Sequence, residues 1–343
     1  MQKILIIRFS ALGDVAMTIP VIYSLAMNFP MHEITVLSRL PFKPLFENLP
    51  SNVRFISADL EGKHKGLIGL NRLFRELKTE KFDYIADFHN VLRTKYLRFR
   101  FKLAGIPTAS LNKARKMKKK LTCKNGKTFK QLKFVFVRYY EVLVRLGFIF
   151  QLNFDSVLAD KKPDFSEIIP FTGEKENIKW IGIAPFAKHA GKIYPLELQQ
   201  KVIEHFANDK RVKVFVFGGG QAEKKIIDDW AIAYSGIVPM VGKLNMSQEL
   251  LLMSKLDVME SMDSGNMHMA SLVGTTVVSV WGATHPYAGF MGWNQLVENA
   301  VQVDLACRPC SIYGQKPCYR TDYACLNNIS PDMIINRIEK ILF

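Results

Sequence analysis

The chain has 343 residues, of which 48% are apolar, so it is long enough for two ordinary domains and apolar enough for packed cores. Its formal net charge of +16 indicates an anionic partner: nucleic acid, an anionic membrane surface or a phosphorylated glycan. No apolar run reaches the roughly 18 residues of a membrane span, and the N-terminal stretch MQKILIIRFSALGD lacks a signal-peptide pattern. We therefore expect a cytoplasmic protein.

The first half of the chain alternates apolar strand-like runs with helical stretches. Strands are predicted at 3–9, 33–38, 53–58 and 82–88. A helix is predicted over 14–29, with Pro20 at an awkward position inside it. This order is the β-α-β pattern of a parallel sheet.

The polar stretch 159–179 contains two prolines and a glycine and predicts a linker. The alternation then restarts, with strand-like runs at 180–185, 212–220, 256–261 and 275–282. An amphipathic helix is predicted over 331–343. The expected fold class is α/β, with two successive halves of similar plan. Because ligands of open parallel sheets bind beyond the carboxyl ends of the strands, the candidate site residues should follow strands.

Asp14 and Gly13 follow the first strand, in SALGDVAMTIP. Gly13 permits a tight turn and the close approach of a ligand. Asp14 is either an N-terminal helix cap or a carboxylate that accepts a proton in a cleft. The loop has no G-x-G-x-x-G pattern, so a nicotinamide dinucleotide is not predicted.

Two further loops follow strands of the second half. The loop APFAKHAGKIYP carries Lys188 and Lys192, which suit a phosphate or form an ordinary basic surface loop. In FGGGQAEKK, Glu223 opens a helix after three glycines. That carboxylate either complements the helix dipole or holds a ribose diol.

The most informative loop is MDSGNMHMA, which follows the strand-like run LDVMES. Asp263 or Ser264 can cap the next helix, Gly265 keeps side chains away, and the helix N-terminus favours an anion. His268, one turn later, can add a donor. An anion would repel Asp263 unless Asp263 holds a donor or a hydroxyl-bearing group, so a sugar nucleotide diphosphate explains the cluster best. The alternative is a capped helix with a core histidine.

Charge and cysteines are both unevenly distributed. Between Asp87 and Glu141 there are 16 lysines and arginines and no acidic residue, densest in NKARKMKKK. This span is either an anion-binding surface or a solvated loop. Four late cysteines are spaced C-x2-C-x7-C-x6-C: Cys307, Cys310, Cys318 and Cys325. They could hold a structural zinc, remain reduced and packed or, less readily in a cytosolic chain, form disulfides.

Taken in order, SALGDVAMTIP, GKIYP, GGGQAEKK, DSGNMHMASLVGTTVVSVWGATHP and the late cysteines resemble glycosyltransferase family 9, the ADP-heptose:lipopolysaccharide heptosyltransferases. The resemblance runs from Lys3 to about Cys325 and is most specific in the D-S-G-x-M-H-x-A block. It implies a GT-B fold, in which two Rossmann-like domains with parallel sheets face a central cleft. The domains are then expected at 1–165 for the acceptor and 176–325 for the nucleotide sugar, with a helix at 326–343 crossing back to the first.

The resemblance also implies an inverting, metal-independent transfer of a heptose from ADP-heptose to a lipopolysaccharide inner-core hydroxyl, without a cofactor. Asp14 matches the catalytic base. The residues that match or neighbour the donor-binding positions are Lys188, Lys192, Glu223, Asp263, Ser264, Gly265 and His268. The predicted acceptor-binding residues are Gly13, Arg93, Arg115, Lys118 and Lys119. Family members can carry hydroxyl residues where this chain has Ala187 and Lys188. This departure leaves the donor's base and sugar less defined.

The expected partners are the ADP-activated sugar, the anionic lipopolysaccharide core and the cytoplasmic face of the inner membrane, where the protein would be peripheral. Two other functions compete with this one. One is a GT-B transferase or sugar-nucleotide epimerase with another donor. The other is a basic nucleic-acid-binding protein, against which the lysine-rich core lacks interleaved aromatic residues and a known module. No specific nucleic acid is therefore expected as a partner.

Overall fold

The computed structural model describes residues 1–159 and 161–343, and the chain divides into two compact units. The first unit comprises Met1–Ala114 and Lys133–Val157, and the second comprises Arg115–Leu132 and Leu158–Phe343. The densest basic segment, expected in the first domain, therefore belongs to the second unit. We call this segment, Arg115–Leu132, the basic strap.

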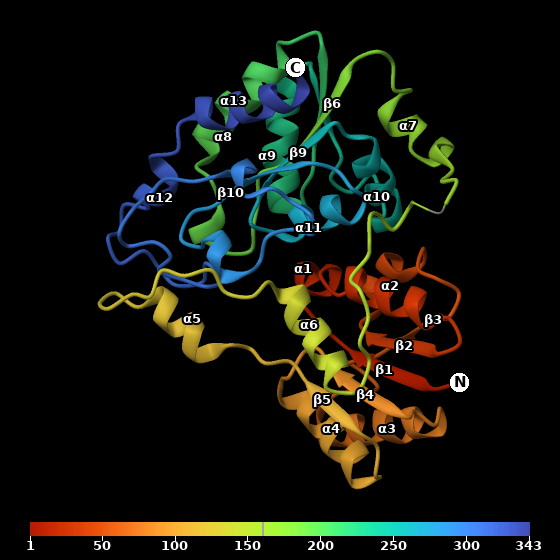
Figure 1. Ribbon diagram of the computed structural model, residues 1–343. Helices are drawn as coiled ribbons and strands as arrows, with labels where there is room; N and C mark the ends of the chain where they lie inside the picture. Colours follow the sequence, from red (N-terminus) through yellow and green to blue (C-terminus); the bar gives the residue numbers. More distant parts are fainter. Residues whose placement is uncertain (160) are drawn as a thin grey trace. The chain divides into compact units, whose positions relative to one another are not determined.

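The first unit is built on a five-stranded parallel sheet in the order β3-β2-β1-β4-β5 (Figure 1). Its strands are β1 (Lys3–Ile7), β2 (Glu33–Ser38), β3 (Val53–Ser57), β4 (Tyr84–Asp87) and β5 (Thr108–Ser110). Its helices are α1 (Leu12–Ala16), α2 (Ile19–Asn28), η1 (Leu40–Phe46), α3 (Gly66–Thr79), α4 (Leu92–Leu103) and α6 (Val135–Val144). The fully buried apolar face of β1 explains its continuous apolar sequence, KILII.

The single helix predicted over 14–29 is two helices in the structure. α1 ends at Ala16, and α2 begins at Ile19 with Pro20 in its first turn. A proline is tolerated there because the first-turn N–H groups have no partner within the helix. Pro20 therefore marks a helix start rather than a strained interior position.

The second unit contains a six-stranded parallel sheet in the order β11-β10-β9-β6-β7-β8. Its strands are β6 (Lys179–Ala184), β7 (Val212–Val216), β8 (Ile237–Pro239), β9 (Val258–Met262), β10 (Val277–Val280) and β11 (Ala300–Val301). Its α-helices are α5 (Arg115–Thr122), α7 (Ile169–Thr172), α8 (Leu196–Ala207), α9 (Gly220–Ala233), α10 (Met246–Lys255), α11 (Gly265–Leu272), α12 (Ala324–Asn327) and α13 (Pro331–Leu342). Its short 3-10 helices are η2 (Phe165–Glu167), η3 (Ala190–Lys192), η4 (Pro286–Ala288) and η5 (Val297–Asn299).

The stretch 159–179, expected to be a linker, is partly regular. It contains η2 and α7 and ends in the first residue of β6, while Asp160 lies outside the described residues. Thr172, in α7, is buried, and Lys213 Nζ donates to its carbonyl oxygen at 2.7 Å. The polar composition did not predict these short helices, because much of the stretch is held by backbone hydrogen bonds rather than by an apolar face.

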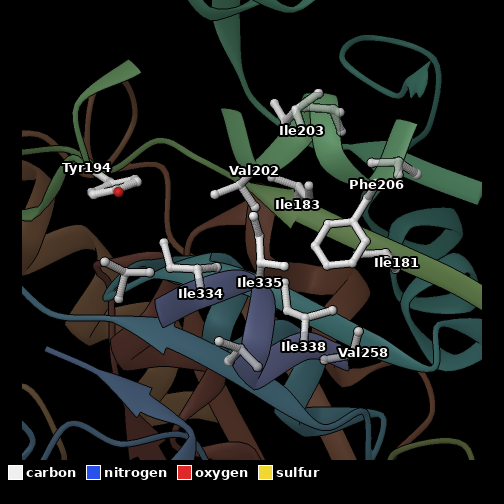
Figure 2. Packing of buried hydrophobic residues seen from close by; sticks show 14 of the residues in the cluster. Ile181, Ile183, Tyr194, Val202, Ile203, Phe206, Val258, Ile334, Ile335 and Ile338 are labelled. Atoms are coloured by element: carbon white, nitrogen blue, oxygen red, sulfur yellow. The ribbon is translucent and has the colours of Figure 1, made fainter. Parts of the chain in front are cut away.

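The C-terminal helix α13 packs within the second unit. Figure 2 shows its isoleucines Ile334, Ile335 and Ile338 among side chains of β6, β9 and α8. These residues belong to one buried apolar cluster, which includes Val202 and Phe206 of α8. The apolar face of α13 thus covers the second sheet, and the expectation that this helix crosses back to the first domain stays a prediction.

Within each sheet, the pairing of strands places particular loops next to each other. β1 pairs with β4, and β6 pairs with β9, in parallel registers. The loops after paired parallel strands leave the same edge of a sheet, so residues far apart in sequence meet there. Among the described residues, no helix has both the length and the apolar character needed to cross a membrane.

Candidate active site

The carboxylate of Asp14 lies beyond the C-terminal end of β1, in the first turn of α1. Its Oδ2 is 2.5 Å from Nη2 of Arg8, and the Ala11 N–H donates to the same oxygen at 3.4 Å. The Asp14 side chain keeps 28% of its surface exposed, against 8% for Arg8. Asp14 thus reaches back to cap its own helix and still presents a carboxylate to solvent, so the two roles expected from the sequence are compatible.

Arg8, which immediately follows β1, is fixed on several sides. Its Nη1 donates to the carbonyl oxygen of Phe88 at 2.9 Å, and its guanidinium lies 5.9 Å from the ring centroid of Tyr139. The Tyr139 hydroxyl in turn donates to the backbone carbonyl of Asp14 at 3.2 Å. Sequence reasoning missed Arg8. The available signal was a cation directly after the strand and six residues before the candidate base.

His89 was also missed, although it follows β4, the neighbour of β1. The Phe9 N–H donates to its Nδ1 at 3.4 Å, so the neutral ring carries its proton on Nε2. Burial, followed by the cations Arg8 and Lys113, lowers the pKa of His89 to about 3. At neutral pH this edge of the sheet therefore holds a charged carboxylate–guanidinium pair and an uncharged imidazole donor.

Two residues predicted to contact an acceptor lie in the first unit. Gly13 has no left-handed backbone; it lies inside α1, and its carbonyl accepts the Met17 N–H at 2.9 Å. The tight turn expected at Gly13 is thus corrected to a helical turn. Arg93 is exposed in the first turn of α4 and is one of the cations that act on His89.

In the second unit, Lys192 and Asp263 form one ion pair. Lys192 ends η3, after β6, and Asp263 follows β9. Lys192 Nζ is 2.8 Å from Asp263 Oδ2 and also donates to the Asp263 carbonyl oxygen at 3.0 Å. The buried aspartate therefore has a cationic partner, which resolves the repulsion that an anion would cause at this position.

The helix α11 begins next to this ion pair. Its N-cap is Ser264, whose hydroxyl lies 3.3 Å from the Ser261 hydroxyl and makes no capping bond to the helix. Gly265 is the first helical residue and His268 is buried one turn later. The expected cap by Asp263 or Ser264 is corrected, and the first-turn N–H groups of α11 are left to serve an anion.

The remaining predicted donor residues have different surroundings. Glu223 Oε2 accepts the Gly219 N–H at 2.7 Å, at the N-terminus of α9. A Cβ at Gly218 would lie 3.1 Å from Glu223 Oε2, so the glycine leaves room for this carboxylate. Lys188 is exposed in the loop that leads to Lys192.

The basic strap carries three predicted acceptor residues, and they differ in exposure. Arg115 and Lys119 are exposed on α5, whereas Lys118 is 9% exposed. Lys118 Nζ donates to the hydroxyl of Tyr313 at 3.0 Å. The structure therefore gives Lys118 an internal partner in the second unit, and it does not unite these three residues with Arg93 in one unit.

The four late cysteines line one cavity, together with Arg308 and Tyr319. All four are free thiols; burial raises the pKa of Cys310 and raises that of Cys325 to about 11. Within the described part of the chain, no three His, Cys, Asp or Glu side chains are arranged to hold a metal ion. The structure records these cysteines as free thiols, and the alternatives of bound zinc and packed reduced thiols both stay predictions.

Several known proteins are similar to this chain. The model of glycosyltransferase family 9 (heptosyltransferase) matches residues 70–318. Lipooligosaccharide heptosyltransferase 2 of Campylobacter jejuni subsp. jejuni serotype O:6 is 22% identical over 349 residues, covering 99% of each chain. The crystal structure of a family 9 glycosyltransferase from Veillonella parvula has a TM-score of 0.76 at 19% identity, covering 99% of this chain and 97% of that one.

A third similar structure is that of a named heptosyltransferase. The structure of Escherichia coli ADP-heptose lps heptosyltransferase II superposes with a TM-score of 0.73 at 16% identity, covering 99% of this chain and 98% of that one. Two Rossmann-like units with parallel sheets and these neighbours define a GT-B glycosyltransferase fold, which confirms the predicted fold class. The chain belongs to glycosyltransferase family 9.

Proposed function

We propose that this protein transfers a heptose from ADP-heptose to a hydroxyl group of the lipopolysaccharide inner core. The family description and the names of the relatives support this activity. The observation that carries the proposal is the Lys192–Asp263 pair beside the N-terminus of α11. It combines a positioned cation and backbone donors, the two features that a diphosphate leaving group needs.

On the donor side, the second unit binds the nucleotide sugar. An ammonium has three N–H donors, and two Lys192 contacts are to Asp263, so one donor can be directed at the diphosphate. The dipole and first-turn N–H groups of α11 add to the same anion site. Glu223 is the candidate partner of the ribose hydroxyls, with Lys188, Ser264, Gly265 and His268 lining the remainder. Negative charge grows on the departing ADP, so these groups act most strongly in the transition state.

On the acceptor side, Asp14 is the proposed base. In a single displacement, the acceptor oxygen forms a bond to the anomeric carbon and its proton passes to the Asp14 carboxylate. The bond from that carbon to the diphosphate oxygen breaks, and ADP leaves with the bonding pair. This path inverts the anomeric centre. It uses one carboxylate, which the structure holds in place through Arg8.

The positive groups of the donor side make a bound metal unnecessary for this chemistry. Lys192 and the α11 N-terminus supply the positive potential that a divalent ion would otherwise supply to a diphosphate. We therefore propose a metal-independent reaction. Turnover should be unchanged by EDTA.

The acceptor is anionic, and exposed cations support its binding. Arg93 in the first unit and Arg115 and Lys119 in the second present charged side chains to solvent. We propose that they bind the charged lipopolysaccharide core and keep the enzyme peripheral to the cytoplasmic face of the inner membrane. Sedimentation with vesicles that contain anionic lipid, falling as salt rises, would check this location.

The test is a calorimetric titration with ADP, ADP-heptose, UDP and GDP, with and without EDTA, followed by mass spectrometry of a core acceptor. Selective binding of the adenine compounds and a mass increase of one heptose support the proposal. Preference for UDP or GDP would retain the fold and move the enzyme to another nucleotide sugar. Absence of nucleotide binding would contradict a transferase function.

A further inference from the structure

The basic strap contains one lysine that is unlike its neighbours. In the sequence KMKKK of α5, Lys116, Lys119 and Lys120 are exposed, whereas Lys118 is buried. Its Nζ donates to the Tyr313 hydroxyl at 3.0 Å and lies 4.6 and 5.0 Å from the ring centroids of Phe290 and Tyr313. A lysine ammonium leaves water at a high cost unless such contacts replace its hydration, so this contact is specific.

Other contacts fasten the strap to the same region of the second unit. Lys127 Nζ donates to the carbonyl oxygens of Ala306 and Arg308, at 3.1 and 2.8 Å. The Leu132 N–H donates to the carbonyl oxygen of Tyr287 at 2.9 Å. The C-terminal part of the strap is thus held by Lys127 and Leu132, and Lys118 contacts the turn that contains Tyr313.

The residue after Tyr313 contacts Lys192 directly. Gly314 has φ +75, and a Cβ there would lie 2.6 Å from Cγ of Lys192, so its backbone packs against the lysine stem. A Cβ on Gly191 would lie 2.9 Å from the Gly314 carbonyl oxygen, and the Ala283 N–H donates to Gly191 O at 2.8 Å. The turn therefore forms a close wall beside Lys192.

The turn is itself built to be rigid on this side. The N–H of Gly314 donates to the Ser311 hydroxyl at 3.0 Å, and the N–H groups of Cys310 and Ser311 donate to the Ala283 carbonyl at 3.1 and 3.2 Å. On its other side, Tyr313 keeps 44% of its surface exposed, and its hydroxyl accepts from Lys118. Lys118 thus holds the exposed side of the turn through the Tyr313 hydroxyl.

We propose that Lys118, acting through Tyr313 and Gly314, is a positioning residue for Lys192 and hence a determinant of donor binding. The inference rests on the proposed function, because it takes Lys192 as the diphosphate-binding lysine. Loss of the Lys118 contact loosens the exposed side of the Tyr313–Gly314 turn, so the backbone of Gly314 packs less closely against the Lys192 stem. The Lys192 ammonium then samples more positions, and its contact with the diphosphate weakens. This also separates Lys118 from the acceptor-binding role predicted for it from sequence.

The test compares Lys118→Met with Lys116→Met, a matched removal of an exposed lysine on the same helix. We expect Lys118→Met to raise the Kd for ADP and the KM for the donor by about tenfold. The KM for the acceptor should stay unchanged, and Lys118→Arg should restore much of the donor affinity.

Tyr313→Phe, which keeps the ring and removes only the hydroxyl, should shift the donor Kd in the same direction by a smaller factor. Lys116→Met should bind ADP as the wild type does.

Two controls separate this inference from the proposed function. Suppose that the wild type binds ADP and that Lys192→Ala weakens this binding. Unchanged ADP binding in Lys118→Met and Tyr313→Phe would then overturn the inference but not the proposed function. Wild type that binds no ADP would overturn both. If Lys118→Met does not fold, as judged by its thermal melt, Tyr313→Phe decides the question alone. An increase in acceptor KM with unchanged donor KM would return Lys118 to the acceptor site.

Discussion

After β1 in the first unit, a carboxylate is held by a guanidinium; after β6 and β9 in the second, an ammonium is held by a carboxylate. In the Arg8–Asp14 pair the arginine side chain is 8% exposed and the aspartate 28%. In the Lys192–Asp263 pair the aspartate is 5% exposed and the lysine 16%. In both pairs the more exposed partner is the one with more surface available to a ligand. From this comparison we expect Asp14 and Lys192 to contact substrate, and Arg8 and Asp263 to position them.

The largest effect should follow from removing the charge of the proposed base. Asp14→Asn keeps the shape of the side chain and its reach to Ala11, but an amide cannot take the acceptor proton. We expect kcat to fall by about 10²–10⁴, measured by ADP release. The Kd for ADP should remain within about twofold, because the donor residues lie in the second unit. An Asp14→Asn enzyme with wild-type turnover would show that another group is the base.

Arg8→Met should lower kcat by about tenfold to a hundredfold and leave the donor Kd unchanged. Methionine fills part of the buried volume but makes no ion pair with Asp14 and no hydrogen bond to Phe88 O. Arg8→Lys should recover part of the turnover, because it restores a cation without the two-armed geometry. Equal kcat for the Met and Lys variants would indicate that Arg8 serves packing alone.

Asp263→Asn should have the opposite signature, a rise of about tenfold in the donor Kd with a smaller change in kcat after saturation. The amide still accepts from Lys192 Nζ, but the loss of charge weakens the hold on its position. Calorimetry with ADP measures the effect. Glu223→Gln is the comparison variant, since Glu223 Oε2 accepts the Gly219 N–H at the N-terminus of its own helix. It should weaken binding of ADP, which has a ribose, but not of inorganic diphosphate. Unchanged ADP affinity in Asp263→Asn would show that Asp263 does not position Lys192 as Arg8 is expected to position Asp14.

The sequence predicted much of this arrangement, and its failures have physical causes. Apolar runs located β1, β2, β6 and β9 because both faces of a parallel sheet are buried. The sequence also placed Asp14, Lys192 and Asp263 after strands. It did not pair Lys192 with Asp263, 71 residues apart, because that contact depends on β6 lying beside β9 in the sheet.

Longer-range packing was also invisible in the local pattern. The lysine-rich core reads as uniformly solvated, yet Lys118 is buried against Phe290 and Tyr313, which lie far along the chain. The same applies to α13: its amphipathic pattern predicted the helix but not which sheet it covers. A helical period identifies an apolar face, and only the tertiary structure identifies its partner.

The smallest expected effect is on the free energy of unfolding, and it concerns two buried carboxyl groups, those of Asp87 and Glu260. Asp87, at the end of β4, accepts the N–H groups of His89 and Asn90 at 3.0 and 2.7 Å. Glu260, in β9, is fully buried and has the Gln199 amide, 3.0 Å from its Oε2, as its hydrogen-bonding partner. Among the described residues, Glu260 Oε1 and Gln199 Oε1 find no hydrogen-bond partner, so the site lacks the donors that a buried carboxylate needs.

Burial raises the pKa of Glu260 to about 8, from an ordinary value of 4.5. Between these values the folded state holds a proton that the unfolded state has released, so stability falls as pH rises, by at most about 1.4 kcal/mol per pH unit. Glu260→Gln imitates the protonated acid and should remove this slope. Its melting temperature should therefore rise relative to that of the wild type between pH 5.5 and pH 7.5, measured by calorimetry in matched buffers. A constant difference between the two proteins over that range would mean that Glu260 is not protonated in the folded state.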